Sequence, residues 1–231
     1  MSLPVTDLEQ RGTVRLIPTA VYKPPVLRPL VDSDEEFALL AQLEGMTNER
    51  LRAEARGLDD LDPRELAFSA RERQLQSWGH TFVNAAFAHT RPDGNRFNDA
   101  RRGAWYAAFE DLTAIEEVAF HRTRELAFVG RFVDEARYVA ILADVIGSFP
   151  DLRGAAPEAL DPDPSTGYPA GQELARALRD NGAAGLIYPS VRHAGGTCFV
   201  AFEPQIVQSP RPGAQWRLTW DGSPAFTVEG V

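Results

Sequence analysis

The alternation of hydrophobic and polar positions is most informative over residues 91–124, where a turn, an apolar run and a helical pattern follow one another. The stretch opens with RPDGN, whose Pro, Asp, Gly and Asn are typical of a turn. The apolar run AWYAAF at residues 104–109 then predicts a short buried strand. Beyond it, three- and four-residue spacing places four residues on one face of a predicted helix: Ala114, Glu117, Val118 and His121.

Residues at the ends of the predicted helices match known start and stop signals. Asp111 or Thr113 is suited to the N-cap of the helix that carries Glu117. A later helix is expected to begin with Pro169 in its first turn and to end at the Asn-Gly pair 181–182.

Short apolar runs bounded by Gly, Pro, Asn or Asp predict the strands of the protein. Besides residues 104–109, strands or buried segments are expected at residues 14–17, 81–88, 137–146, 185–188, 197–202, 216–220 and 225–228. The proline-rich stretch 148–168 is expected to be a loop. Because short strands alternate unevenly with helices, the sequence predicts an α+β fold with a mixed, largely antiparallel sheet.

The chain divides into three parts. Residues 1–32 contain several prolines that interrupt regular structure, so we interpret them as an extended arm on the body, with a mobile tail as the alternative. Residues 33–79 show helical spacing with many charges. They are expected to pack on the core, or to form a dimer or partner surface. Residues 80–231 make up the main domain.

Composition and charge narrow the function classes. With 231 residues, 44% hydrophobic and 25% charged, the chain is typical of a soluble globular protein. The sequence shows neither a signal peptide nor an apolar run of membrane-spanning length, so we expect a cytoplasmic protein. The net charge of -9 argues against direct binding to nucleic acid or an anionic membrane. An anionic substrate therefore needs a local group of arginines, and one occurs at Arg91, Arg96, Arg101 and Arg102.

Metal and nucleotide motifs of the common kinds are absent from the sequence. Cys198 is the only cysteine, and the four histidines lack metal-binding spacing, so no metal site is expected. Neither a GxGxxG nor a GxxxxGK[ST] motif occurs. The central stretch instead offers a loop arginine, Tyr106 in a strand and a glutamate on the next helix. An arginine to hold phosphate, a ring to stack and a carboxylate to face a sugar indicate a nucleotide pocket.

Three segments resemble a known family. They are GNRFN, then WYAAFE followed by TAIEEVAFHR, and finally YPSVRHAGGTCFVAFEP. In this order they are similar to the RES-domain family, which is named for an arginine, a glutamate and a serine. The family comprises NAD-degrading toxins of bacterial toxin–antitoxin pairs, and the resemblance implies a fold similar to ADP-ribosyltransferases. It covers residues 80–202, so residues 80–231 are interpreted as a RES-type catalytic domain.

The resemblance implies roles for individual residues of the central stretch. Arg96, in GNRFN, matches the arginine of the family's glycine–arginine–aromatic motif and would grip phosphate oxygens. Asn95 stands where a second glycine is common. Tyr106 would stack on the nicotinamide or bond to the ribose. The family glutamate falls on Glu116 or Glu117, and the family's Ala-apolar-x-Glu-Val pattern favours Glu117.

Ser190, in YPSVR, matches the third name-giving residue. No GxSxG motif surrounds it, so it is expected to hydrogen-bond to the ligand or to Glu117 rather than to act as a nucleophile. Arg192 beside it is expected to line the pocket. Family members usually carry a further arginine upstream of the GNRFN motif, for which this sequence offers three candidates: Arg71, Arg73 and Arg91. The sequence does not choose among them, and Arg91 joins Tyr106 and Arg192 as an expected substrate-binding residue.

The resemblance implies an NAD+ phosphorylase or glycohydrolase. Such an enzyme cleaves the nicotinamide–ribose bond and transfers ADP-ribose to inorganic phosphate or water. NAD+ would be its substrate, inorganic phosphate a co-substrate, and no resident cofactor is expected. Glu117 would stabilise the positive charge that develops on the ribose in the transition state. Transfer of ADP-ribose to a macromolecule and a non-catalytic binding module stay open as alternatives.

The resemblance also implies a partner. NAD+ depletion would make this chain the toxin of a pair, blocked by an antitoxin that carries a helix-turn-helix region. The toxin itself then has no need to contact DNA, in agreement with its acidic charge. Whether the protein forms a homodimer is left open.

Overall fold

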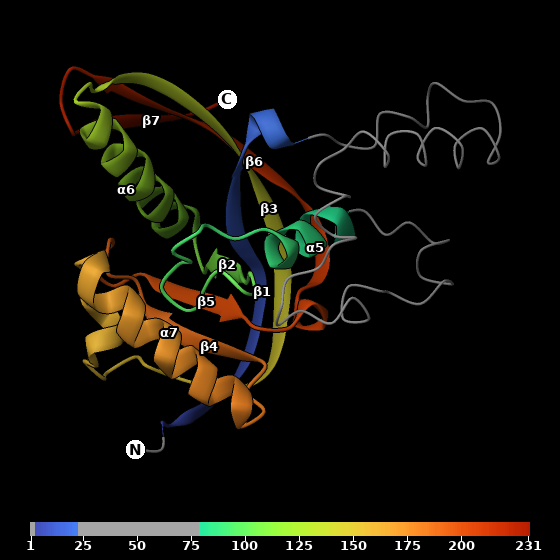
Figure 1. Ribbon diagram of the computed structural model, residues 1–231. Coiled ribbons are helices and arrows are strands. Elements are labelled where there is room, and N and C mark those ends of the chain that lie inside the picture. Colours follow the sequence, from blue (N-terminus) through green and yellow to red (C-terminus); the bar gives the residue numbers. More distant parts are fainter. Residues whose placement is uncertain (1–2, 23–78) are drawn as a thin grey trace, which may run out of the picture.

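A seven-stranded sheet forms the centre of the protein in the computed structural model, which describes residues 3–22 and 79–231 (Figure 1). The strands follow the order β4-β5-β2-β1-β3-β6-β7, and each neighbouring pair is antiparallel. The strands are β1 (Val5–Pro18), β2 (Trp105–Ala108), β3 (Val133–Pro150), β4 (Gly185–Pro189), β5 (Thr197–Ala201), β6 (Gln208–Asp221) and β7 (Phe226–Gly230). The helices are α5 (His80–Ala88), α6 (Asp111–Val129) and α7 (Pro164–Asp180), with short 3-10 turns η1 (Thr19–Val21), η3 (Glu158–Leu160) and η4 (Pro204–Ile206).

This antiparallel sheet with its helices is an α+β fold, as the sequence predicts. Within the described part of the chain, parallel pairing is limited to one isolated bridge between Asp151 and Ile187. The expectation of a largely antiparallel sheet is therefore confirmed. No helix in residues 3–22 or 79–231 is long and apolar enough to cross a membrane.

β1 is the central strand of the sheet and is longer than the sequence indicates. The prediction was a short strand at residues 14–17 within an arm, whereas β1 pairs with β3 along almost its whole length. The described part of residues 1–32 therefore belongs to the sheet and is not an arm on its surface. The sequence hides this strand because Thr6 and Gln10, which are polar, occupy partly buried positions of its first half.

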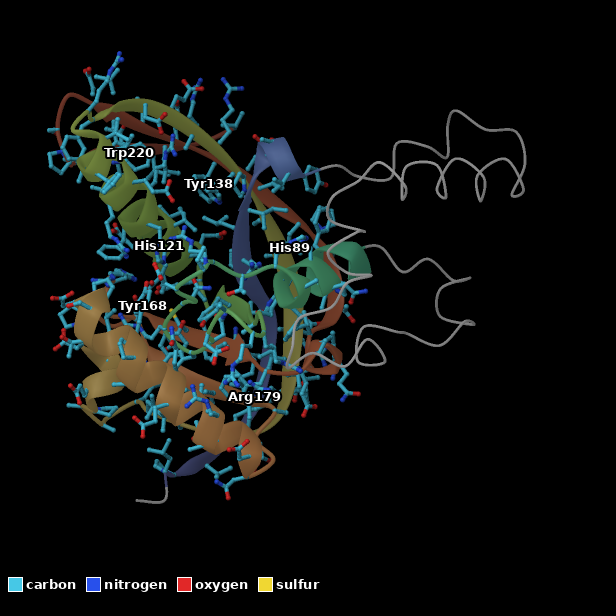
Figure 2. The ribbon with its side chains drawn as sticks, in the orientation of Figure 1. His89, His121, Tyr138, Tyr168, Arg179 and Trp220 are labelled. Carbon is cyan, nitrogen blue, oxygen red and sulfur yellow. The ribbon has the colours of Figure 1, made fainter. Side chains whose placement is uncertain are left out.

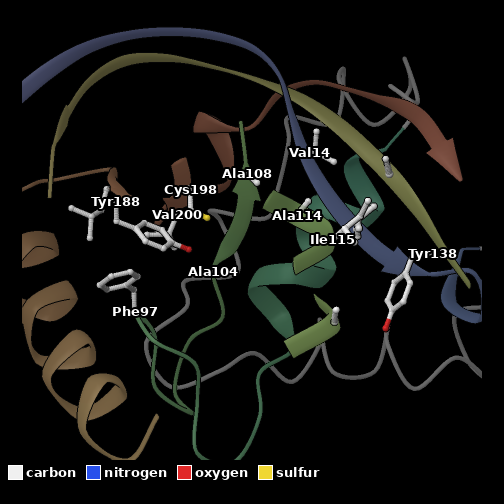
Figure 3. Packing of buried hydrophobic residues seen from close by; sticks show 14 of the residues in the cluster. Val14, Phe97, Ala104, Ala108, Ala114, Ile115, Tyr138, Tyr188, Cys198 and Val200 are labelled. Carbon is white, nitrogen blue, oxygen red and sulfur yellow. The ribbon is translucent and has the colours of Figure 1, made fainter. Parts of the chain in front are cut away.

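Two hydrophobic cores lie against the sheet, and β5 shows how they divide. Its side chains alternate, because successive residues of a strand point to opposite faces. Cys198 and Val200 belong to the core that also contains residues of α6 and α7, whereas Phe199 and Ala201 belong to the core beneath α5. Figure 3 shows the first core, with Cys198 and Val200 close to Tyr188 of β4. The cavity described below lies on the α6 and α7 side.

α5 occupies residues 81–88, which the sequence predicts as a strand or buried segment; the strand assignment is wrong. Four apolar side chains of α5 are buried in one core: Phe82, Val83, Ala86 and Phe87. Their spacing describes one face of a helix, whereas a strand would send neighbouring residues to opposite faces. A short apolar run fits either element, and here the packing decides. Gly79 precedes the helix with φ of 90°, a conformation that suits glycine.

α7 begins at Pro164, five residues before the predicted Pro169. Asp163 caps the helix, since its carboxylate accepts a hydrogen bond from the backbone N–H of Ser165 at 2.9 Å. Pro164 fits the first turn, where no intrahelical N–H is needed. Pro169 lies inside the helix. The helix ends at Asp180 with Asn181 as its C-cap, as the Asn-Gly pair predicts.

The remaining strand predictions are confirmed, with bounds that differ: β2 and β5 are slightly shorter than predicted, whereas β3, β4, β6 and β7 extend further at one end or both. β3 starts before residue 137 and runs to Pro150, so it takes the beginning of the stretch 148–168 that the sequence predicts as loop. α6 is confirmed, but its N-cap residue is Glu110, which makes no side-chain capping bond. Thr113 instead donates to Glu110 Oε1 at 2.9 Å. The helical segment expected at residues 33–79 lies outside the described residues, apart from Gly79.

Candidate functional site

A cavity of about 240 Å³ lies between α6, the start of α7 and the central strands of the sheet. Its lining comes from β1, β2, β4, β5, α5, α6 and α7, and from the loops before β2 and after β4. Four charged side chains reach it from separate parts of the chain: Arg15, Arg96, Glu117 and Arg192. Tyrosine rings and small apolar residues make up much of the rest.

Glu117 and Ser190 meet in this cavity. The hydroxyl of Ser190 donates to Glu117 Oε1 over 2.6 Å. The same oxygen, Ser190 Oγ, accepts the backbone N–H groups of Arg192 at 3.1 Å and His193 at 3.0 Å. A serine hydroxyl has two lone pairs and one proton, so these two donors fill its acceptor sites and direct its proton to the carboxylate. Ser190 is thus a fixed donor to Glu117 and is not placed as a nucleophile.

One oxygen of Glu117 stays available to a ligand. Ser190 and the thiol of Cys198, at 3.9 Å, both approach Oε1. Within the described residues no hydrogen bond reaches Oε2. Burial raises the pKa of the Cys198 thiol well above its ordinary value, so the sulfur stays protonated beside the carboxylate. Glu116, the alternative that the sequence offered, does not line the cavity.

Tyr106 lines the cavity with its ring and uses its hydroxyl within the protein. The hydroxyl accepts the backbone N–H of Phe97 and donates to Asn98 Oδ1, both at 2.9 Å. Burial raises the pKa of Tyr106, so it is neutral at physiological pH. Its hydroxyl therefore fixes the GNRFN loop, which carries Arg96, and only the ring remains for contact with a ligand.

Arg96 is almost fully buried beneath α7 and has a structural task. Its Nη1 donates to the backbone oxygens of Ala159 at 2.7 Å and Asp161 at 2.8 Å. Its guanidinium lies 5.4 Å from the centre of the Tyr168 ring. The Nε and Nη2 groups make no hydrogen bond to a described residue. Arg96 thus holds the η3 turn with one nitrogen and can meet an anion with the others.

Arg192 is the second expected arginine that the fold brings to the cavity. Its guanidinium carbon lies 3.3 Å from the centre of the Phe120 ring of α6, and Nη2 donates to Pro162 O at 2.7 Å. Burial, and then the charge of Arg96, lower the pKa of Arg192. Arg91 is not among the lining residues and pairs with Glu125 at 3.2 Å on the surface.

Arg15, on β1, is a site residue that the sequence analysis misses. It lines the cavity, and its Nη1 donates to Tyr106 O at 3.1 Å. Its guanidinium lies 5.0 Å from the centre of the Trp105 ring. Burial lowers the pKa of Arg15 to about 10, so the group remains a cation at neutral pH. The sequence did contain a signal for it, because an arginine within the apolar run at residues 14–17 is unusual and indicates a buried or functional position. Arg71 and Arg73 lie outside the described residues.

A second set of side chains fixes the turn that carries Ser190. His193 Nδ1 lies 2.8 Å from Thr113 Oγ1, near the start of α6. The backbone N–H of Ser190 donates to Gly196 O at 2.8 Å. A Cβ on Gly196 would lie 2.4 Å from Thr113 Oγ1, so the close approach of turn and helix requires glycine. The distance between Ser190 and Glu117 is thereby set by packing as well as by their own bond.

The cavity carries an excess of positive charge, although the protein as a whole is acidic. The protein carries a net charge of -9, yet three guanidinium groups and one carboxylate line this site. None of the three arginines forms an ion pair with a carboxylate of the described residues. Such uncompensated cations in a partly buried cavity favour an anion. Within residues 3–22 and 79–231, no three His, Cys, Asp or Glu residues gather to hold a metal ion.

These features define an antiparallel α+β domain with a cationic pocket and one carboxylate held by a serine. The sequence model of the RES domain family matches residues 69–221, more than half of the chain, and the protein belongs to this family. The chain is also 26% identical over 218 residues to y4oC of Sinorhizobium fredii, an uncharacterized protein. That alignment covers 90% of this chain and 83% of y4oC. Arg15 precedes the matched range, whereas Arg96, Glu117 and Ser190 lie within it.

Proposed function

We propose that this protein cleaves the nicotinamide–ribose bond of NAD+ and transfers ADP-ribose to inorganic phosphate or water. The observation that carries the proposal is the state of Glu117. Ser190 holds one carboxylate oxygen, the other has no protein donor among the described residues, and the cavity around it is otherwise cationic. A carboxylate so placed is suited to a group that becomes positively charged during reaction while its neighbouring groups are anionic.

The arginines suit the anionic part of NAD+. Its pyrophosphate carries two negative charges, and guanidinium groups bind phosphate oxygens through charge-assisted hydrogen bonds. Arg15 and Arg192 both line the cavity, one from β1 and one from the turn after β4. Arg96, on the GNRFN loop, adds Nε and Nη2, which make no hydrogen bond to a described residue. In the proposed complex the three guanidinium groups bind the pyrophosphate and thereby fix the distance of the ribose from Glu117.

The size of the cavity limits what it can enclose. At about 240 Å³ it falls below the roughly 300–1,000 Å³ that is typical of pockets that surround a whole drug-sized ligand. In the proposed complex it takes the nicotinamide, its ribose and the adjoining phosphates. The adenosine end extends toward the protein surface. The rings of Tyr106 and Tyr168 supply flat apolar walls for the nicotinamide side.

The proposed reaction requires that positive charge on the ribose be stabilised. When the bond between ribose C1′ and the nicotinamide nitrogen breaks, its electron pair leaves with nicotinamide and positive charge develops on the sugar. The free Glu117 oxygen, facing the ribose hydroxyls, stabilises this charge more in the transition state than in the ground state. Ser190 keeps the carboxylate oriented, so little reorganisation is needed during reaction. The acceptor oxygen then bonds to C1′ and gives up a proton where the acceptor is water.

The role of a toxin and the helix-turn-helix antitoxin belong to the same proposal and rest on the family alone. An experiment with NAD+ labelled in its adenylate half tests the enzymatic part. Free labelled ADP-ribose, or its phosphorylated form when inorganic phosphate is present, supports the proposal and identifies the acceptor. Label attached to protein or nucleic acid supports transfer to a macromolecule instead. Unchanged NAD+ under all these conditions, with the protein folded, overturns the proposal.

A further inference from the structure

His121 lies one helical turn beyond Glu117 on α6 and lines the same cavity, but neither its ring nor its charge has a part in the chemistry above. Figure 2 labels it on α6, with Tyr168 on α7, two elements that both contribute to the cavity wall. Its ring packs edge-on against Phe120, with the ring centres 5.4 Å apart. Phe120 in turn carries the Arg192 guanidinium on its face.

The two ring nitrogens of His121 differ in their surroundings. Nδ1 is buried and has no hydrogen-bond partner. Nε2 is not enclosed in this way, and it too makes no hydrogen bond to a described residue. A ligand in the cavity can therefore reach the ring only at its Nε2 edge. Nε2 is therefore the ring nitrogen of His121 that a ligand can bond to.

The surroundings decide where the imidazole proton sits. Burial lowers the pKa of His121 to about 4, and the charges of Arg91, Arg124, Arg192 and Arg96 act in the same direction. A proton on Nδ1 would in addition be a buried N–H without an acceptor, which costs on the order of 1–3 kcal/mol. The neutral ring with its proton on Nε2 avoids the buried charge and the orphaned N–H. It leaves at Nδ1 a buried lone pair without a donor, which proteins tolerate more readily than a buried N–H without an acceptor. Glu117, the carboxylate on the same helix face, is already bonded to Ser190.

We propose that His121 is a substrate-binding residue, whose neutral ring donates its Nε2–H to a phosphate oxygen in the cavity. The phosphate oxygen belongs either to the pyrophosphate of a dinucleotide or to inorganic phosphate. For the dinucleotide the inference rests on the proposed function. Arg96 and Arg192 act on this ring from the GNRFN loop and from the turn after β4, and because both line the cavity they favour an anion beside it. The imidazole adds a directed hydrogen bond to their charge.

Two substitutions separate this role from its rivals. His121→Gln retains a side-chain N–H that can donate, but it cannot take up a proton. His121→Leu has a similar apolar bulk and no donor. We expect the Gln variant of the full chain to bind ligand within about threefold of the wild type, and the Leu variant to bind roughly tenfold more weakly, as for a hydrogen bond to a charged group.

Calorimetric binding of two probes, inorganic phosphate and ADP-ribose, identifies the source of the phosphate oxygen. If His121→Leu weakens the binding of ADP-ribose but not of inorganic phosphate, the Nε2–H bond goes to the pyrophosphate. If it weakens the binding of inorganic phosphate but not of ADP-ribose, the bond goes to the phosphate that accepts ADP-ribose. Leu and wild-type proteins that bind both probes equally well overturn the proposal. A Gln variant that binds both probes as weakly as the Leu variant also contradicts the donor role, because its side-chain N–H should replace Nε2–H.

The ring can also be observed directly. Nitrogen-15 NMR of the histidine side chains, with His121 assigned through the Gln variant, should show the Nε2–H form unchanged from about pH 5 to 8. The Nδ1–H form, or protonation near neutral pH, contradicts the proposal. These binding and NMR readouts need no turnover. If the protein leaves NAD+ intact, the proposed function is refuted, and the binding and NMR results still show whether His121 is a donor to phosphate.

Discussion

The hydroxyl of Ser190 lies 2.6 Å from Glu117 Oε1 and joins the turn after β4 to the middle of α6. Two residues that lie 73 positions apart in the sequence thus form one unit, in which the serine orients the carboxylate. The backbone N–H groups of Arg192 and His193 fix the hydroxyl in turn. These bonds lead from the main chain to the serine and on to the carboxylate of Glu117, which lines the cavity.

Loss of the serine hydroxyl should slow turnover without unfolding the protein. In Ser190→Ala the carboxylate loses its donor, and a hydrogen bond to a charged group is worth about 1.5–3 kcal/mol, so the rate should fall roughly 10- to 100-fold. Ser190→Thr, which keeps a hydroxyl, should recover much of it. Steady-state kinetics and thermal unfolding of both variants check this. Equal rates for Ala and wild type would contradict the orienting role.

Arg15 should contribute to substrate binding more than to the chemical step. Arg15→Met removes a cation that has no carboxylate partner among the described residues, so KM for NAD+ should rise roughly tenfold or more while kcat changes less. Arg11→Met is a matched control on the same strand, because Arg11 is exposed and pairs with Glu9 at 2.9 Å. A KM that rises equally in both variants would show a general loss of positive charge and not a site on β1.

Arg96 should matter for the fold as well as for the ligand. Arg96→Lys cannot reproduce the bonds from Nη1 to Ala159 O and Asp161 O, so the free energy of unfolding should fall by about 1.5–3 kcal/mol. Arg101→Lys, at an exposed residue of the same loop, should leave stability within about 0.5 kcal/mol. Denaturant unfolding of both variants measures the difference. A stable Lys variant at position 96 would mean that the η3 turn is held by other contacts.

His121 should make the fold sensitive to acid. In the unfolded chain its pKa is near 6.5, whereas in the folded protein it is about 4, so between these values the unfolded state binds more protons. Stability is full above about pH 7 and declines as the pH falls toward 4. From pH 8 to pH 5 this residue alone should lower the free energy of unfolding by about 2 kcal/mol.

The comparison of wild type with His121→Leu isolates this contribution, because the other titratable groups are common to both. Denaturant unfolding at pH 8 and pH 5 should show a smaller decline in the Leu variant. Parallel declines in the two proteins would mean that His121 titrates alike in the folded and unfolded states.

The sequence could predict much of the site because its residues sit in short, recognisable segments. Glu117 and Ser190 were placed by motifs within one continuous domain, and they meet in the cavity. Arg15 could not be placed in this way, since it lies before the range that the family model matches and its strand lacks regular alternation. Tyr106 was expected to stack on the nicotinamide or to bond to the ribose, and only the fold shows that its hydroxyl is already bonded to the GNRFN loop.

The sequence predicted the fold correctly where the hydrophobic pattern was clear. The prediction failed where packing alone decides between helix and strand. Residues 185–188 and 197–202 are continuous apolar runs between turns, and both became strands of the sheet, β4 at its edge and β5 beside it. Residues 81–88 are equally apolar, yet their burial in a single core makes them a helix. The start of α7 was missed because two prolines five residues apart both fit a first turn, and Asp163 decides between them by capping.

Release of nicotinamide from NAD+ tests the central claim most directly. Wild-type protein, Glu117→Gln and Glu116→Gln should be compared, each with and without inorganic phosphate. We expect release by the wild type and by Glu116→Gln, and a loss of roughly 10²–10³ in rate for Glu117→Gln, since a preorganised group that meets developing charge is worth ~3–4 kcal/mol. No release by folded wild-type protein, or loss in Glu116→Gln and not in Glu117→Gln, would contradict the assignment of the carboxylate beside Ser190 as the catalytic group.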